Sequence, residues 1–161
     1  MKTIQSIREY GINIGSMKPG KRNSITDVPG VQVGHHTLQA GPMQTGVTAI
    51  RPHTGNIFKE KVVAASHVFN GFGKTMGLPQ VEELGTIETP IVLTNTLSIG
   101  AAAQAVIEMA LKENPEIGRT TGTVNPVIGE CNDMVLNDIR SGYVQKEHVI
   151  SALKNTDVEF E

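Results

Sequence analysis

The stretch PIVLTNTLSIGAAAQAVIEMALKEN, residues 90–114, decides the fold, because it changes from the pattern of a buried strand to that of a helix. The apolar run at residues 90–96 predicts a buried strand. Ser98 is expected to be the N-cap of the helix, and Asn114, which precedes a proline, is expected to end it. One face of this helix is built from small and apolar side chains, namely Ile99, Ala102, Ala103, Val106, Met109 and Ala110.

The segments on either side extend the pattern. Upstream of residue 90, the sequence predicts three strands, at residues 31–38, 45–52 and 61–73, and the last of them runs into a glycine-rich loop. Downstream of the helix it predicts a strand at residues 125–131, a short helix at 134–140 and an amphipathic helix at 145–155. In this last helix Val149, Ile150 and Leu153 are expected to face inward.

Strands therefore come first, and strands and helices are mixed afterwards. This order predicts an α+β fold or a layered sandwich and not a regular doubly wound sheet. No change of composition and no low-complexity segment divides the chain, so residues 1–161 are expected to form a single domain.

Composition excludes several classes of function. The formal net charge is −2 and Lys and Arg form no run, so nucleic acid is not expected as a partner. No apolar stretch approaches the roughly 18 residues that span a bilayer, so no membrane partner is expected. The single cysteine, Cys131, permits no internal disulfide and fits a reducing cytoplasm.

Neither the cysteine nor the histidines predict a site. Cys131 has no histidine close by in the sequence, so we expect a buried structural thiol and not a nucleophile. The five histidines include no pair at helical ligand spacing, and the neighbours His35 and His36 would point to opposite faces of a strand. We therefore expect neither a metal nor an organic cofactor.

Two glycine- and threonine-rich segments allow two interpretations each. The run Asn70 to Thr75 (NGFGKT) faintly resembles a phosphate loop but lacks its full spacing, so a tight turn that lines a pocket is favoured. Residues 94–98 lie between a buried strand and a helix. Their backbone N–H groups could hold an anion or a developing oxyanion, or the segment could simply cap the helix.

A third group of polar residues follows the strand at 125–131. Glu130, Asn132 and Asp133 come together in the stretch GECND. A carboxylate in that position can bind a substrate ammonium group, and an amide can donate to an oxyanion; the alternative is a solvated acidic turn. These residues favour a small-molecule pocket without naming a reaction.

Several stretches, in their order along the chain, resemble the DmpA-like aminopeptidases, a family of L-aminopeptidase/D-esterases and β-peptidyl aminopeptidases. They are NSITDVPGVQVGHHTL, TGVTAIRPHTG, HVFNGFGKTMG, ETPIVLTNTLSIG, NPVIGECNDMVLNDI and VQKEHVISAL. The resemblance implies an αββα sandwich related to the N-terminal-nucleophile hydrolases. It also implies a precursor that cuts itself at a Gly–Ser bond, frees the nucleophilic serine and assembles as a tetramer of protomers.

The resemblance also implies roles for individual residues. Glu130 matches a glutamate that lies beside the substrate's free amino group. Asn132 matches a position where some relatives carry an oxyanion-hole tyrosine, so it becomes an oxyanion candidate. Asn70 and Asn95 match segments that line the substrate pocket. Small peptides and aminoacyl amides or esters are the implied substrates.

The chain differs from this family at its end. Residue 161 comes before the family's glycine-rich segment and its Gly–Ser junction, so no nucleophile is matched here. The resemblance implies most of an α portion, with a complementary β segment as partner and an incomplete sandwich by itself. Two other functions stay open: a non-catalytic protein that binds amine metabolites or acts as a subunit, and an acyltransferase similar to the ornithine acetyltransferases.

Overall fold

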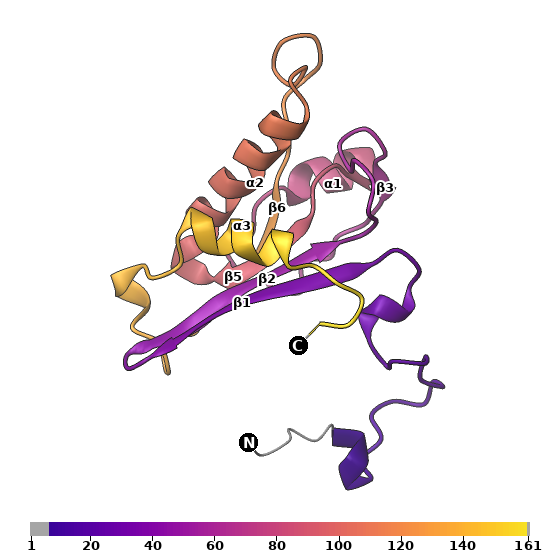
Figure 1. Cartoon of the computed structure of the whole chain (residues 1–161), viewed down its shortest axis with the longest axis vertical. Coiled ribbons are helices and arrows are strands. Elements are labelled where there is room, and N and C mark those ends of the chain that lie inside the picture. Colours follow the sequence, from indigo (N-terminus) through magenta and orange to yellow (C-terminus); the bar gives the residue numbers. More distant parts are fainter. Residues whose placement is uncertain (1–6, 161) are drawn as a thin grey trace.

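The computed structural model describes residues 7–160, and its centre is a four-stranded sheet (Figure 1). The strand order is β1–β2–β5–β6. These strands span Gln32–Ala40 (β1), Met43–Arg51 (β2), Ile91–Asn95 (β5) and Val127–Cys131 (β6). β2 is antiparallel to both of its neighbours, β1 and β5, whereas β5 and β6 are parallel. The strands predicted around 31–38, 45–52, 90–96 and 125–131 are therefore confirmed.

Two helices cover one face of this sheet, α2 at Ile99–Glu113 and α3 at Lys146–Lys154 (Figure 1). Their apolar faces pack on inward side chains of the strands, including Val92 and Ile128, which are almost completely buried. α3 lies so close to β1 that a Cβ at Gly34 would come within 2.2 Å of the Ala152 carbonyl oxygen. Both helices were predicted, so the mixed α+β class is confirmed.

The opposite face of the sheet is largely open. Because side chains alternate along a strand, Leu93 and Gly129 point away from the helices that cover Val92 and Ile128. In the strand register they are paired in one row across the sheet with Thr48 and His35, which therefore lie on the same open face. Leu93 is 41% exposed, which is high for a leucine in a central strand. The four-stranded sheet and its helical layer thus supply two of the layers that an αββα sandwich requires.

A small subdomain covers the end of this open face where β5 and β6 begin. It contains the helix α1 at Leu78–Leu84 and a two-stranded ribbon of β3 (Val62–Val63) and β4 (Thr86–Ile87). Val81 and Ile87 pack there on Ile91 and Val127. The prediction of one long strand over 61–73 was wrong, since only two of those residues are in a strand, and α1 was not predicted.

The predicted helix at 134–140 was also wrong. The side chain of Asn132 accepts a hydrogen bond from the Met134 amide, and this local bond competes with helix formation. Met134, Val135 and Leu136 are all more than 60% exposed, so an apolar helix face would have nothing to pack against. The segment forms turns and ends in a short 3₁₀ helix, Ile139–Ser141.

The N-terminal segment of the described chain, indigo in Figure 1, runs away from the sheet. It exposes several large apolar side chains, namely Tyr10, Ile12, Ile14 and Met17. Tyr10 ends a short 3₁₀ helix, Ile7–Tyr10, and the other three lie in irregular chain.

Candidate functional site

The candidate site lies where the parallel strands β5 and β6 end. Their register places Thr94 beside Glu130 and Asn95 beside Cys131. The chain continues from β5 into a 3₁₀ turn, Thr96–Ser98, and then into α2. Polar side chains that follow two adjacent parallel strands meet at one edge of the sheet, which is where open α/β sheets bind ligands.

Glu130 is held in place by two donors from other parts of the chain. The Thr96 hydroxyl donates to one carboxylate oxygen, and the Lys74 backbone N–H donates to the other at 3.0 Å. The Thr96 bond, then the Lys74 amide and the Lys74 charge hold the pKa of Glu130 below its ordinary value, against the opposing effect of partial burial. The carboxylate is therefore ionised at neutral pH. It keeps acceptor capacity, since a carboxylate has about four acceptor sites.

The loop before α1 forms one wall of this site. The Asn70 side-chain oxygen accepts from the Phe72 amide at 3.1 Å, which closes a tight turn. A Cβ at Gly73 would lie 3.7 Å from a Glu130 carboxylate oxygen, so the loop passes directly beside the carboxylate. The tight turn expected for NGFGKT is confirmed. Asn70 uses its side-chain oxygen within this turn, and its predicted contact with substrate stays a prediction.

The side chain of Asn95 is buried, with 3% of the residue exposed, and only one of its two polar atoms has a hydrogen-bond partner. Its side-chain nitrogen donates to the Thr45 hydroxyl at 2.9 Å, while its side-chain oxygen is buried and has no partner among the described residues. A hollow of about 230 Å³ lies beside it, lined also by Cys131 and Asp133. An unpaired buried acceptor is costly, so Asn95 is suited to receive a donor from a ligand or from another segment.

Asn132 is exposed at the end of β6. Its oxygen is occupied by the Met134 amide, which leaves its side-chain N–H groups as the part that could donate to an oxyanion. The role predicted for Asn132 stays a prediction. Asp133 accepts from Asn137 at 3.1 Å, and Asn137 accepts in turn from the Gln44 amide, so Asp133 supports the turn.

Among the neighbouring residues, the expectation for Cys131 was wrong and the predicted N-cap position of Ser98 is confirmed. Cys131 is exposed and not buried, because β6 is near its end there and the open face leaves the thiol uncovered. Ser98 occupies the N-cap position of α2, directly after the 3₁₀ turn, but its side chain makes no cap hydrogen bond. The hydroxyl of Thr96, in the same segment, binds Glu130 instead of capping the helix.

The sequence analysis did not identify Thr96 and Lys74 as partners of Glu130. They lie 34 and 56 residues before it, and no local pattern links either to a carboxylate. The signals that could have found them are the place of Thr96 directly after a strand and of Lys74 in a glycine-rich loop.

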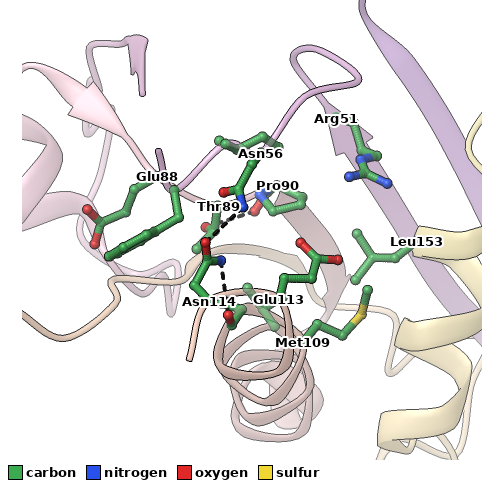
Figure 2. Close-up of a pocket in the computed structure, with 13 residues that line it drawn as sticks. Arg51, Asn56, Glu88, Thr89, Pro90, Met109, Glu113, Asn114 and Leu153 are labelled. Carbon is green, nitrogen blue, oxygen red and sulfur yellow. Dashed lines mark hydrogen bonds between the residues drawn. The ribbon is translucent and has the colours of Figure 1, made fainter. Parts of the chain in front are cut away.

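A second pocket lies on the helical side, between α2 and residues 51–58 (Figure 2). The Asn56 side chain donates to Asn114 at 2.8 Å, and Asn114 donates to the Ala110 carbonyl at 3.0 Å. Arg51 lines the opposite side, with a buried Nε that has no partner among the described residues. The cavity of about 30 Å³ has room for about one or two waters and none for a peptide substrate, so it is not the candidate site.

Within residues 7–160, no three potential metal-ligating side chains come together, and no helix is long and apolar enough to cross a membrane. His35 and His36 do point to opposite faces, as predicted. His35 contacts Thr48 and Phe160, whereas His36 stacks on His148 of α3 with 4.9 Å between ring centroids.

Comparisons with known proteins show similarity to one peptidase family. The family model for peptidase family S58 matches residues 23–160. A β-peptidyl aminopeptidase from Sphingosinicella xenopeptidilytica is 36% identical over 144 residues, a match that covers 84% of this chain and 35% of that protein.

Two solved structures show the same fold. A protein from Pyrococcus horikoshii OT3 is 57% identical with a TM-score of 0.94, and the match covers 98% of this chain and 47% of that chain. The second is the L-aminopeptidase D-Ala-esterase/amidase from Ochrobactrum anthropi, which is described as a variant of the Ntn-hydrolase fold. It is 30% identical with a TM-score of 0.84, and the match covers 96% of this chain and 45% of that chain. The chain thus spans less than half the length of each of these relatives.

Proposed function

The chain belongs to peptidase family S58, and from this premise we propose that it forms the amine-binding part of a serine aminopeptidase with an N-terminal nucleophile. The complete enzyme would release N-terminal residues from small peptides, amides or esters. Its nucleophilic serine would come from a segment outside these 161 residues, freed by self-cleavage at a Gly–Ser bond.

The observation that supports this proposal is the state of Glu130. Thr96 and Lys74 orient its carboxylate and keep it ionised, and acceptor sites remain for a further donor. A substrate's N-terminal ammonium group has three N–H donors and the opposite charge. Charge-assisted hydrogen bonds of this kind are among the strong ones, so the carboxylate can fix the amino end of a substrate at the strand ends.

The other residues of the site would act around that anchor. With the ammonium on Glu130, the first carbonyl of the substrate lies one residue away, and the incoming serine would attack it. The side-chain N–H groups of Asn132 would donate to the oxyanion that forms, as preorganised donors do in acyl transfer. Asn70 and Asn95 would line the pocket, with the unpaired oxygen of Asn95 accepting from the substrate or from the segment that carries the serine.

We also propose a complementary segment and an assembly. The open row around Leu93 and Gly129 would be covered by a second sheet, which would complete the αββα sandwich. The exposed apolar side chains of residues 10–17 support contacts between protomers in a homo-oligomer, with a tetramer as the expected state. The single cysteine agrees with a cytoplasmic location.

The test is hydrolysis of aminoacyl p-nitroanilides by the full-length gene product, with α- and β-amino-acid substrates, each beside its N-acetylated form. We expect cleavage of the free amines and almost none of the acetylated forms, because acetylation removes the charge that Glu130 binds. Cleavage of both forms at equal rates would contradict the role of Glu130. Acyl transfer to ornithine without hydrolysis would favour the acyltransferase, and binding without either reaction would favour a non-catalytic protein.

A further inference from the structure

Lys74 contributes two groups to the candidate site. Its backbone N–H binds the Glu130 carboxylate at 3.0 Å. Its side chain turns onto Phe72, where the ammonium donates to the Phe72 carbonyl at 2.5 Å and lies 3.7 Å from the centre of the ring. One residue therefore places a cation beside the anion that is proposed to bind the substrate amine.

Among the described residues this cation forms no close ion pair, although its charge acts on Glu130 at longer range. Lys59, Lys61 and Lys146 each form an ion pair with a glutamate, whereas Lys74 forms none, not even with the Glu130 carboxylate that its own amide binds. The Phe72 carbonyl and ring hold the ammonium instead. An ammonium has three N–H donors, so donors remain after the Phe72 carbonyl has taken one.

The Glu130 carboxylate and the Lys74 ammonium lie apart on the same side of the site. They would suit a ligand that carries a positive charge at one end and a negative charge at the other. A short peptide with free ends is such a molecule, and two residues span about 7 Å at full extension. The separation at the site is limited by the length of one lysine side chain, because the same residue binds Glu130 and carries the ammonium. A dipeptide is therefore long enough to reach both groups, whereas in a long extended peptide the terminal carboxylate lies far beyond Lys74.

We propose that Lys74 is a specificity-determining residue that binds a substrate carboxylate, so that the site prefers dipeptides with a free C-terminus over the corresponding amides. This inference rests on the proposed function only in placing the substrate amine on Glu130. Because Lys74 is exposed, the preference is screened by salt and modest in size.

The kinetic test uses the full-length gene product. It compares a dipeptide with its C-terminal amide, in the wild type, in Lys74→Met and in Lys112→Met. Lys112 is a matched control, since it is an exposed lysine in the last turn of α2. We expect the ratio of kcat/KM for acid over amide to fall about 3- to 10-fold in Lys74→Met, to stay unchanged in Lys112→Met, and to fall in the wild type as salt is raised.

A binding measurement separates this inference from the proposed function. 5-Aminolevulinic acid is the uncleavable ketomethylene analogue of glycylglycine, and its primary amide lacks the carboxylate. We expect calorimetry to show tighter binding of the acid than of the amide by wild type, and equal binding by Lys74→Met. If the acid binds more tightly than the amide in this way but the protein hydrolyses no peptide, the aminopeptidase proposal is rejected and the role of Lys74 in binding the carboxylate stands. Hydrolysis with equal binding and equal kcat/KM for acid and amide, or no binding of either analogue, would overturn the role of Lys74.

Discussion

Thr96 donates its hydroxyl hydrogen to the carboxylate of Glu130, 34 residues further along the chain, and this bond joins the ends of two parallel strands. Thr96 opens the turn that leads from β5 into α2, and Glu130 is the next-to-last residue of β6. The orientation and the charge of the carboxylate therefore depend on the register between the two strands.

Removing this donor should change the titration of Glu130. Thr96→Val keeps the shape of the side chain and removes the hydroxyl, so the pKa of Glu130 should rise toward its ordinary value. The ionised fraction would then be lost at a higher pH than in the wild type. We expect kcat/KM of the full-length protein for free-amine substrates to fall about 2- to 3-fold near pH 4, where a carboxyl of ordinary pKa is largely protonated, and to change little through this route above pH 6. Carbon-detected NMR of the Glu130 carboxyl measures the pKa directly; an unchanged titration would contradict the assigned bond.

The same variant has an expected effect on stability. Because the pKa of Glu130 is lowered in the folded state, its contribution to stability is present above the unfolded-state pKa and is lost as the pH falls through the folded-state pKa. Thr96→Val removes part of that contribution, so acid unfolding should begin at a higher pH. Circular dichroism during acid titration provides the measurement, and Thr37→Val, an exposed threonine on β1, provides a control.

Neutralising the carboxylate should affect substrate binding more than folding. Glu130→Gln keeps the size of the side chain and can still accept from Thr96 or Lys74, so a melting curve close to that of the wild type is expected. A charge-assisted bond of about 1.5–3 kcal/mol corresponds to a loss of about 10- to 200-fold in kcat/KM for free-amine substrates. Asp133→Asn should cost less, because Asp133 bonds Asn137 within the turn. Equal activity of wild type and Glu130→Gln, with both folded, would remove Glu130 from the site.

Two glycine substitutions should differ in cost. A Cβ at Gly34 would meet the backbone oxygen of Ala152 at 2.2 Å, and neither α3 nor β1 can move away cheaply. A Cβ at Gly129 would meet only the end of the Leu93 side chain at 2.8 Å, and that side chain can turn toward the open face. Gly34→Ala should therefore lower the free energy of unfolding by about 2–3 kcal/mol and Gly129→Ala by about 1 kcal/mol or less. Urea unfolding measures both, and the reverse order would show that α3 packs differently on β1.

The 161-residue chain by itself should not behave as an active monomer. It has no matched nucleophile, so we expect no hydrolysis of aminoacyl p-nitroanilides. Leu93, Leu136 and the apolar residues of the N-terminal segment are exposed, so we expect association at micromolar concentration in sedimentation. A monodisperse monomer would show that the open face of the sheet is stable in water without a second sheet or another chain packed on it. Turnover that is abolished by changing one of the chain's own serines would show that the nucleophile lies within it.

The elements that could be predicted from sequence are those whose pattern is local. β5 and α2 follow from an apolar run and a 3.6-residue period, and α3 follows from the same period around Val149 and Leu153. Residues 61–73 offered no such regularity. Gly77 has a φ of 91° and precedes a short helix with a proline, Pro79, in its first turn, so the switch from ribbon to helix depends on backbone freedom and on packing against Val127.

For the site, the sequence alone determined that a carboxylate, an amide and a second carboxylate follow a buried strand, and its resemblance to one family singled out Glu130 among them. Only the tertiary structure decided that Thr96 and the Lys74 amide orient that carboxylate, that Asp133 supports a turn and that Cys131 is exposed. The physical reason is distance along the chain. Periodicity reports which face of its own element a side chain occupies, whereas the partners of Glu130 come from segments that meet it only after β5 and β6 have paired and the loop before α1 has closed over their ends.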